Sequence, residues 1–398
     1  MEKHQDDAPV IVVGGGLGGV ATALALGQQG RKVRLLEQSA EIAPIGYGVQ
    51  IGPNVLPMLA RLGLEEEVRQ AAYLPDDLLL LDAYTGNQLF RIPLKGSAFE
   101  QRFAAPYIAI HRVDLHEILL RACRRLPNVD LNQAITVESF RLQDDAVSVQ
   151  AAGGRTITGS ALVAADGLRS KLRTQLHPTD IWRDTGYVAH RTIAQREHAP
   201  QRMRDRTGVT MLTGDGFHVI YYPLRGGSEI NIVGVFQVPG ALEPDTPAYQ
   251  RHIAQLIDSA TAEVHDVVGV LNMTRRWSIA DREPVRRWHQ GRMTLIGDAA
   301  HATLQSLAQG AGMALEDAVT LAELMAGQPD DPSRAFAQFE RQRFLRTTRV
   351  VLESRSLWQM YHCGGVEAEV RNQQLQERTT EDYYRCLGWL WNPSKEGK

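Results

Sequence analysis

A glycine-rich hexapeptide near the N-terminus, "GGGLGG" at residues 14–19, limits the possible folds of this chain more than any other feature. It follows "PVIVV" (9–13), a short apolar, β-branched run that is typical of a buried strand. It precedes "VATALALGQQG" (20–30), whose alanines and leucines predict a helix that ends at a glycine. The next apolar run, "KVRLLE" (32–37), predicts a second strand. Together these segments form a βαβ unit, which implies a parallel sheet with a right-handed crossover.

The glycines of this hexapeptide, Gly14, Gly16 and Gly19, have the spacing of a turn that binds a dinucleotide. The first permits the tight bend, the second lets a pyrophosphate approach the backbone, and the third lets the helix pack closely on the strand. The helix N-terminus offers unpaired N–H groups to the phosphates, and Glu37 can accept hydrogen bonds from ribose hydroxyls. A glycine-rich turn without a ligand is the alternative, but strand, helix and acid together favour binding. The motif alone does not separate FAD from NAD.

Two further junctions between an expected strand and an expected helix carry an acid. Asp166 follows "LVAA" and opens "DGLRSKLR", and a simple Asp-Gly turn explains this junction on physical grounds alone. Asp298 lies in "GDAAHATLQSLAQG" (297–310), after the apolar run "MTLI". The helix that begins near Gly310 would direct its positive end towards a negatively charged group. A loop with a helix cap is the alternative there, and a packed, hydrogen-bonded side chain is the ordinary interpretation of His301.

The domain organisation is indicated by a change in composition after about residue 180, where several segments alternate apolar and polar residues between turns. They predict antiparallel strands, with a hairpin at "PLRGGSE". We expect an α/β fold with a Rossmann-like nucleotide-binding domain, an inserted antiparallel-sheet substrate domain and a helical C-terminus. The expected bounds are 1–180 for the first part of the nucleotide-binding domain, with interspersed strands of the substrate domain, 181–285 for the substrate domain, 286–350 for the second part of the nucleotide-binding domain, and 351–398 for the helical C-terminal region.

Composition excludes several classes of protein. The formal net charge of −3 gives no electrostatic reason to expect nucleic-acid binding. The N-terminus lacks an apolar signal core, and no apolar run has the length of a membrane span. Cys123, Cys363 and Cys386 lack metal-ligand spacing, so we expect no metal site and a reduced, cytoplasmic location.

One strand of the expected insertion, "GFHVIYYP" (216–223), carries side chains suited to chemistry. Because side chains alternate along a strand, His218, Ile220 and Tyr222 share one face, where a histidine and a tyrosine can line one pocket. A histidine of near-neutral pKa would be suited to proton transfer. The strand alone favours the alternative, a half-buried sheet with a hydrogen-bonded histidine.

Taken together, the motifs resemble those of a known family. The glycine turn with Glu37, "GYGVQIGPNVLPMLARLG", "HRVDL", "DGLRSKLR" and "GDAAHATLQSLAQGAGMALEDA" occur in the order and spacing of the FAD-dependent aromatic hydroxylases, the group of p-hydroxybenzoate and salicylate hydroxylases. The resemblance spans residues 9 to about 350. It implies a homodimeric flavoprotein monooxygenase that binds FAD, uses NADH or NADPH and dioxygen, and hydroxylates a small aromatic acid through a flavin hydroperoxide.

The resemblance also assigns residues to the cofactor. Asp166, with Gly167, would serve both FAD and the nicotinamide cofactor, and Gly310 would lie at the pyrimidine edge of the flavin. From the ADP half of FAD towards the flavin ring, the expected cofactor-binding residues are Gly14, Gly16, Gly19, Glu37, Arg112, Asp166, Asp298 and Gly310.

The substrate side resembles most the members that convert 3-hydroxybenzoate to gentisate, at His218, Tyr222, Tyr107 and Gln305. This resemblance implies that the histidine and the glutamine assist deprotonation of the substrate, while the tyrosines and the glutamine contact its ring substituents. Gln305 departs from the pattern of the wider family, in which many members carry proline at this position. Salicylate or 6-hydroxynicotinate are alternative substrates. An FAD dehydrogenase or oxidase that inserts no oxygen, or a non-enzymatic NAD-binding sensor, are alternatives of another class.

Overall fold

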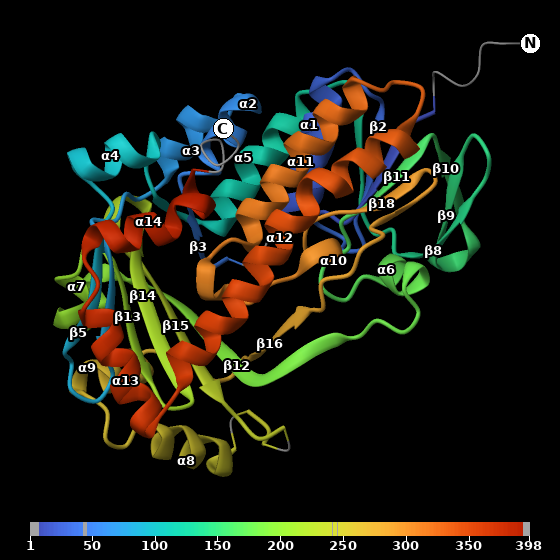
Figure 1. Ribbon diagram of the computed structural model, residues 1–398. Coiled ribbons are helices and arrows are strands. Elements are labelled where there is room, and N and C mark those ends of the chain that lie inside the picture. Colours follow the sequence, from blue (N-terminus) through green and yellow to red (C-terminus); the bar gives the residue numbers. More distant parts are fainter. Residues whose placement is uncertain (1–7, 43–45, 241, 245, 393–398) are drawn as a thin grey trace, which may run out of the picture.

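The computed structural model describes residues 8–42, 46–240, 242–244 and 246–392 (Figure 1). A helix-covered parallel sheet occupies the upper right of the view and a larger, mostly antiparallel sheet the lower left (Figure 1). The long helix α12 (Pro332–His362) contacts β17 and β18 of the parallel sheet and also β13 and β14 of the larger one. The fold is therefore a Rossmann-like α/β domain joined to a sheet-rich domain, with a helical C-terminus, as the sequence predicts.

The parallel sheet has six strands in the order β17-β18-β11-β1-β2-β7, and only the pair β17–β18 is antiparallel. Val10 of β1 lies beside Ala161 on one side and Val33 on the other. The helix α1 (Leu17–Gln28) connects β1 to β2 and packs against α5 and α11, which confirms the predicted βαβ unit. The strand bounds are β1 (Val10–Val13), β2 (Val33–Leu36), β7 (Val129–Asn132), β11 (Ala161–Ala164), β17 (His289–Gln290) and β18 (Met293–Leu295).

The larger sheet has seven strands in the order β16-β12-β15-β14-β13-β4-β5. Its central strands are antiparallel, and β14 and β15 form the predicted hairpin around Arg225–Gly227. The strands β4 and β5 come from before residue 100, and β4 pairs with β13 in parallel. The division of the chain near residues 180, 285 and 350 stays a prediction. The strand bounds are β4 (Asp77–Asp82), β5 (Gln88–Pro93), β12 (Trp182–Gln195), β13 (Val209–Gly214), β14 (Phe217–Leu224), β15 (Glu229–Gln237) and β16 (Trp277–Arg282).

The two faces of this sheet differ. Phe217, Val219 and Tyr221 of β14 are buried in an apolar core that also holds side chains of α8 (Pro247–Leu256) and α9 (Ala262–Gly269). His218, Ile220 and Tyr222 line a cavity on the opposite face. The alternation predicted for this strand is thus the one that the structure shows.

Short elements complete the fold. The strands β3 and β6 form an antiparallel pair, and β8, β9 and β10 form a small sheet of their own. Among the described residues, no helix is long and apolar enough to span a bilayer. The remaining bounds are β3 (Gly48–Ile51), α2 (Leu56–Arg61), α3 (Glu65–Ala71), α4 (Ser97–Phe103), β6 (Ile108–His111), α5 (Arg112–Arg124), β8 (Val137–Leu142), β9 (Val147–Ala151), β10 (Thr156–Gly159), α6 (Lys171–Leu176), α7 (Gln201–Arg204), α10 (Asp298–His301), α11 (Gly310–Ala326), α13 (Gly365–Gln376) and α14 (Thr380–Trp391).

Candidate functional site

The glycine turn after β1 is shaped by close contacts at two positions and by open space at the third. Gly14 has a φ of +108°, and a Cβ placed there would lie 2.3 Å from the carbonyl oxygen of Ala165. A Cβ on Gly19 would lie 1.8 Å from the carbonyl oxygen of Gly14. Gly16 instead faces a large cavity, with no atom within 4 Å of an added Cβ. Gly14 and Gly19 are therefore required by packing, whereas Gly16 leaves room for a ligand against the N-terminus of α1.

Glu37 holds the turn from outside the cavity. Its Oε2 accepts a hydrogen bond of 2.6 Å from the backbone N–H of Gly15, and its Oε1 accepts one of 2.8 Å from that of Ser39. These bonds fix the direction of the carboxylate, and its remaining lone pairs can still accept hydrogen bonds from a diol.

Arg112 and Asp298 bring opposite charges to the cavity wall without forming a hydrogen bond to each other or to another described side chain. Burial lowers the pKa of Arg112, while Asp298 opposes that shift. Burial likewise raises the pKa of Asp298, whose carboxylate is open to the cavity but surrounded by protein. Charged groups in such a position usually have partners. A polar chain carrying phosphate and hydroxyl groups, like that of FAD, fits between them and Gly310 at the start of α11.

Asp166 is the predicted cofactor residue that the structure does not bring to this wall. Its Oδ1 accepts a hydrogen bond of 2.6 Å from the Ser170 hydroxyl, and its Oδ2 accepts one of 3.3 Å from the Leu172 N–H. The carboxylate therefore serves the turn before α6, while its neighbours Ala165 and Gly167 line the cavity. The simple Asp-Gly turn explains the described contacts of Asp166.

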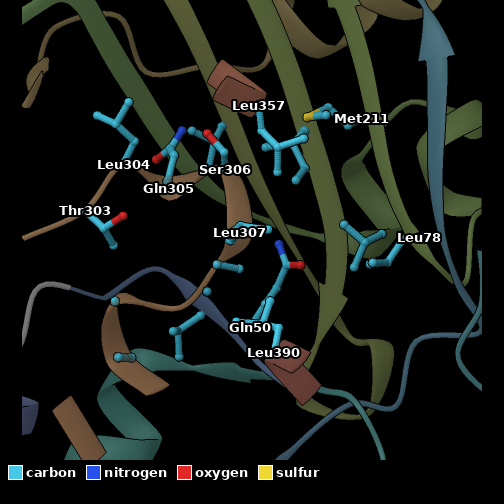
Figure 2. A pocket seen from close by; sticks show the side chains of 18 of the residues that line it. Gln50, Leu78, Met211, Thr303, Leu304, Gln305, Ser306, Leu307, Leu357 and Leu390 are labelled. Atoms are coloured by element: carbon cyan, nitrogen blue, oxygen red, sulfur yellow. The ribbon is translucent and has the colours of Figure 1, made fainter. Parts of the chain in front are cut away.

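The cavity has a volume of about 930 Å³ and extends from the glycine turn to the face of the larger sheet. Figure 2 shows the loop with Thr303, Gln305 and Leu307 across the cavity from Leu78 and Met211. Most of the side chains at this end are apolar, so the few polar groups among them determine how a ligand would be oriented.

Two of these polar groups are the predicted tyrosines. The Tyr107 hydroxyl donates a hydrogen bond of 2.6 Å to Oε1 of Gln50, whose side chain points into the cavity (Figure 2). Tyr222 is also buried, and its hydroxyl lies so close to Gly48 that a Cβ there would be 2.7 Å away. Burial raises the pKa of Tyr107 and brings that of Tyr222 to about 12. Both tyrosines therefore stay neutral at pH 7.

Gln305 contacts a cation that the sequence analysis missed. Its Oε1 accepts a hydrogen bond of 3.0 Å from Nη2 of Arg191, on β12. Because arginine only donates, the amide orientation is fixed, and the amide nitrogen is left for a ligand. Arg191 lines the cavity and forms no ion pair within the part of the chain that the structure describes. A charged residue inside the alternating strand "YVAHRTIA" was the signal that could have found it.

His218 faces the cavity but also contacts a second histidine, His362, at the end of α12. Nδ1 of His218 lies 2.7 Å from Nε2 of His362. Burial, together with His362, holds the pKa of His218 well below its usual range. The expectation of a near-neutral pKa is therefore wrong, because the ring of His218 is almost fully buried against Trp358 and His362 of α12. Sequence reasoning also missed His362 and Gln50, since nothing local relates either to the strand of His218.

Comparison with known proteins agrees with this geometry. Residues 7–353 match the FAD binding domain family. The 3-hydroxybenzoate 6-hydroxylase of Polaromonas naphthalenivorans (strain CJ2) is 37% identical over 98% of both chains, and that of Klebsiella oxytoca is 39% identical over 96% of both. The crystal structure of Klebsiella pneumoniae HpxO complexed with FAD and uric acid has a TM-score of 0.86 at 25% identity, covering 97% of both chains. With a glycine turn, a charged wall and a helix N-terminus that fit FAD, this chain belongs to the FAD binding domain family and has FAD as its cofactor.

Proposed function

We propose that this protein is an FAD-dependent aromatic-ring monooxygenase that hydroxylates 3-hydroxybenzoate para to its hydroxyl group, which gives gentisate. The observation that carries the proposal is Arg191, a half-buried cation without a carboxylate partner among the described residues, beside Gln305 on the wall of a mostly apolar cavity. Such a cation favours a flat apolar ligand that brings its own negative charge. The relatives named for this reaction, which align along nearly the whole chain, support the choice of substrate.

The polar groups of the cavity suit a ring with one carboxylate and one hydroxyl. Arg191 attracts the carboxylate, and the neutral hydroxyls of Tyr107 and Tyr222 can hydrogen-bond to it or to the ring hydroxyl. The amide nitrogen of Gln305, held in direction by Arg191, donates to an oxygen of the substrate. The apolar walls exclude water and hold the ring in one orientation. Bound FAD, once reduced by the nicotinamide cofactor, supplies the activation of dioxygen.

His218 is the base of the proposed reaction. Loss of the phenolic proton raises the electron density at the ring carbon para to the hydroxyl, where oxygen is inserted. A phenol has a pKa of about 10, and that of an ordinary histidine is about 6.5, so complete transfer costs at least about 5 kcal/mol. The lowered pKa of His218 increases this gap. Proton transfer is therefore expected to be completed only as oxygen transfer draws electron density from the ring.

The test is substrate-stimulated consumption of NADH by the FAD-loaded protein, with products identified by chromatography. A panel of 2-, 3- and 4-hydroxybenzoate and 6-hydroxynicotinate is compared. We expect the greatest stimulation with 3-hydroxybenzoate and one gentisate per NADH. Hydrogen peroxide as the sole product of all four compounds would indicate an oxidase, and preferential hydroxylation of another compound would refute the substrate assignment.

The electron donor, assembly and location belong to the same proposal: NADH rather than NADPH, a homodimer, and the cytoplasm. Leu345 and Leu352 are exposed at 70% and 46% and lie on one face of α12, which supports an interface there. The cysteines that the structure describes are unpaired, in keeping with a reducing compartment. Steady-state rates with each nicotinamide cofactor and light scattering of the purified protein test the first two points.

A further inference from the structure

Two histidines from distant parts of the chain stack against each other at the wall of the large cavity. His218 comes from the middle of the larger sheet, on β14, and His362 is the last residue of α12. Their ring centroids are 4.9 Å apart, with an angle of 29° between the ring planes. Their side chains are buried, and Nδ1 of His218 lies 2.7 Å from Nε2 of His362. A hydrogen bond therefore joins the rings.

The direction of this hydrogen bond follows from a third group. Nδ1 of His362 lies 2.7 Å from the backbone carbonyl oxygen of Trp358, which can only accept. Nδ1 of His362 must then carry the proton, so Nε2 of the neutral ring has a free lone pair. Consequently Nδ1 of His218 is the donor between the rings, and Nε2 of His218 is left unprotonated. The chain of contacts thus fixes His218 in the tautomer whose Nε2 can accept a proton.

The surroundings of the pair keep both rings neutral before the reaction begins. The aromatic rings of Tyr187, Trp358 and Tyr361 pack around them. Burial, with a smaller contribution from Arg371, lowers the pKa of His362 to about 4. The carboxylate of Asp215 lies in the turn before β14, next to Gly216, the residue whose N–H bonds the His362 carbonyl. No carboxylate among the described residues forms an ion pair with either ring.

The pair also lies between two cavities. His218 lines the large cavity, whereas His362 lines a second one of about 370 Å³ on the other side, together with Tyr187, Trp358 and Arg355. A proton that reaches His362 has therefore left the large cavity.

We propose that His362 is a positioning residue for His218 and the second member of a proton relay that leads away from the substrate, an inference that rests on the proposed function. When the O–H bond of the phenol breaks, the proton bonds to Nε2 of His218. The Nδ1 proton of His218 passes to Nε2 of His362. His218 ends neutral, in its other tautomer, and His362 ends as the cation, with Nδ1–H still bonded to the Trp358 carbonyl. The positive charge thereby moves away from the large cavity.

The decisive variants distinguish the positioning role of His362 from its role in proton transfer. In His362→Gln, the amide oxygen can still accept from Nδ1–H of His218 and the amide nitrogen can donate to the Trp358 carbonyl, but the amide takes up no proton. In His362→Leu both functions are lost. Tyr187→Phe is the matched control, because it keeps the ring that packs on His362 at a centroid distance of 4.5 Å and leaves every histidine contact in place.

With 3-hydroxybenzoate as substrate, we expect His362→Gln to keep its KM and lower kcat for gentisate formation about tenfold to hundredfold, within the usual range for proton-transfer groups. The kcat of this variant should recover at high pH, whereas Tyr187→Phe should match the wild type. In a His218→Ala background, His362→Leu should cause no further loss, because a positioning residue acts only through its partner. Equal losses from His362→Leu in both backgrounds would overturn the proposal.

A second measurement does not depend on activity. Nitrogen NMR of ¹⁵N-histidine protein should show Nε2 of His218 unprotonated in the wild type and a mixture of tautomers in His362→Leu. An unchanged tautomer would refute the positioning role. A wild-type enzyme that hydroxylates no hydroxybenzoate would refute the proposed function and, with it, the transfer step. An active wild type with an unchanged kcat in His362→Gln would refute the relay alone.

Discussion

Arg191 is the residue whose replacement tests the site most directly, because binding and stability should respond in opposite ways. In Arg191→Met the side chain keeps much of its length and loses its charge. A charge pair at about 4 Å contributes about 4 kcal/mol at an effective dielectric constant of about 20. Desolvation of the substrate carboxylate reduces this gain, and a net loss of about 2–3 kcal/mol is typical of a hydrogen bond to a charged group. The Kd for 3-hydroxybenzoate should therefore rise about 30-fold to 150-fold.

The free protein should not become less stable. Arg191 is half-buried and partly desolvated beside Gln305, without an ionic partner in the described part of the chain, so its removal relieves a desolvation cost. We expect the Tm of the variant to equal that of the wild type or to exceed it by about 1–3 °C. A Tm well below that of the wild type would show that Arg191 instead supports the fold.

The assay is a titration of the FAD-loaded protein with 3-hydroxybenzoate, followed by the change in flavin absorbance, beside a thermal melt without substrate. The neutral analogue 3-hydroxybenzamide is the control, because it keeps the ring and the phenol but carries no carboxylate. Its Kd should change less than about threefold between the two proteins. A similar loss for acid and amide would refute the assignment of Arg191 to the carboxylate.

Three further predictions concern His218, Gln305 and Asp317. His218→Ala should bind FAD normally and hydroxylate slowly, with part of the loss relieved at high pH, where the phenol ionises unaided; unchanged turnover would exclude it as the base. Gln305→Pro should increase the hydrogen peroxide formed per NADH without loss of FAD, and loss of FAD would mean that this residue supports the fold. Burial opposes ionisation of Asp317, but His301 and Arg343 outweigh it and lower its pKa from 3.8 to about 2. Its stabilising contribution is therefore complete above pH 3.8 and lost as the pH falls through about 2. Asp317→Asn should lower the free energy of unfolding by about 3–5 kcal/mol at pH 7. Urea unfolding should also show that the stability of this variant changes less with pH in the acid range.

The parts of the fold that the sequence predicted are those encoded by local patterns. The βαβ unit follows from one glycine spacing between two apolar runs, and the set of β14 side chains that faces the cavity follows from simple alternation. His301 also agrees with its ordinary interpretation, because its Nε2 lies 2.6 Å from Oδ2 of Asp317 in a buried pair. In each case the neighbours that decide the structure lie close in sequence or follow a fixed period.

The parts that sequence reasoning missed depend on pairings between distant segments. Gln50 meets Tyr107 because β3 pairs with β6, and Arg191 meets Gln305 across 114 positions of the chain. His362 reaches His218 because the 31-residue helix α12 extends from the parallel sheet to the larger one. No local sequence pattern predicts that the C-terminal end of this helix lies beside β14. The error on the pKa of His218 has the same origin, since burial of that ring depends on α12.

Two predicted residues of the site, Arg112 and Asp298, share one physical property with Arg191, which sequence reasoning missed. Arg112, Arg191 and Asp298 carry charges on the cavity wall and are partly desolvated by the protein around them, yet none forms an ion pair within the described residues. Elsewhere in the fold, buried charges are paired, as Asp317 is with Arg343. A desolvated charge without a partner lowers the stability of the folded protein, and the rest of the fold must offset this cost. A bound ligand of complementary charge reduces the cost. FAD and an aromatic acid together should therefore stabilise this protein against thermal unfolding more than FAD alone, and the added stabilisation by the acid should vanish in Arg191→Met.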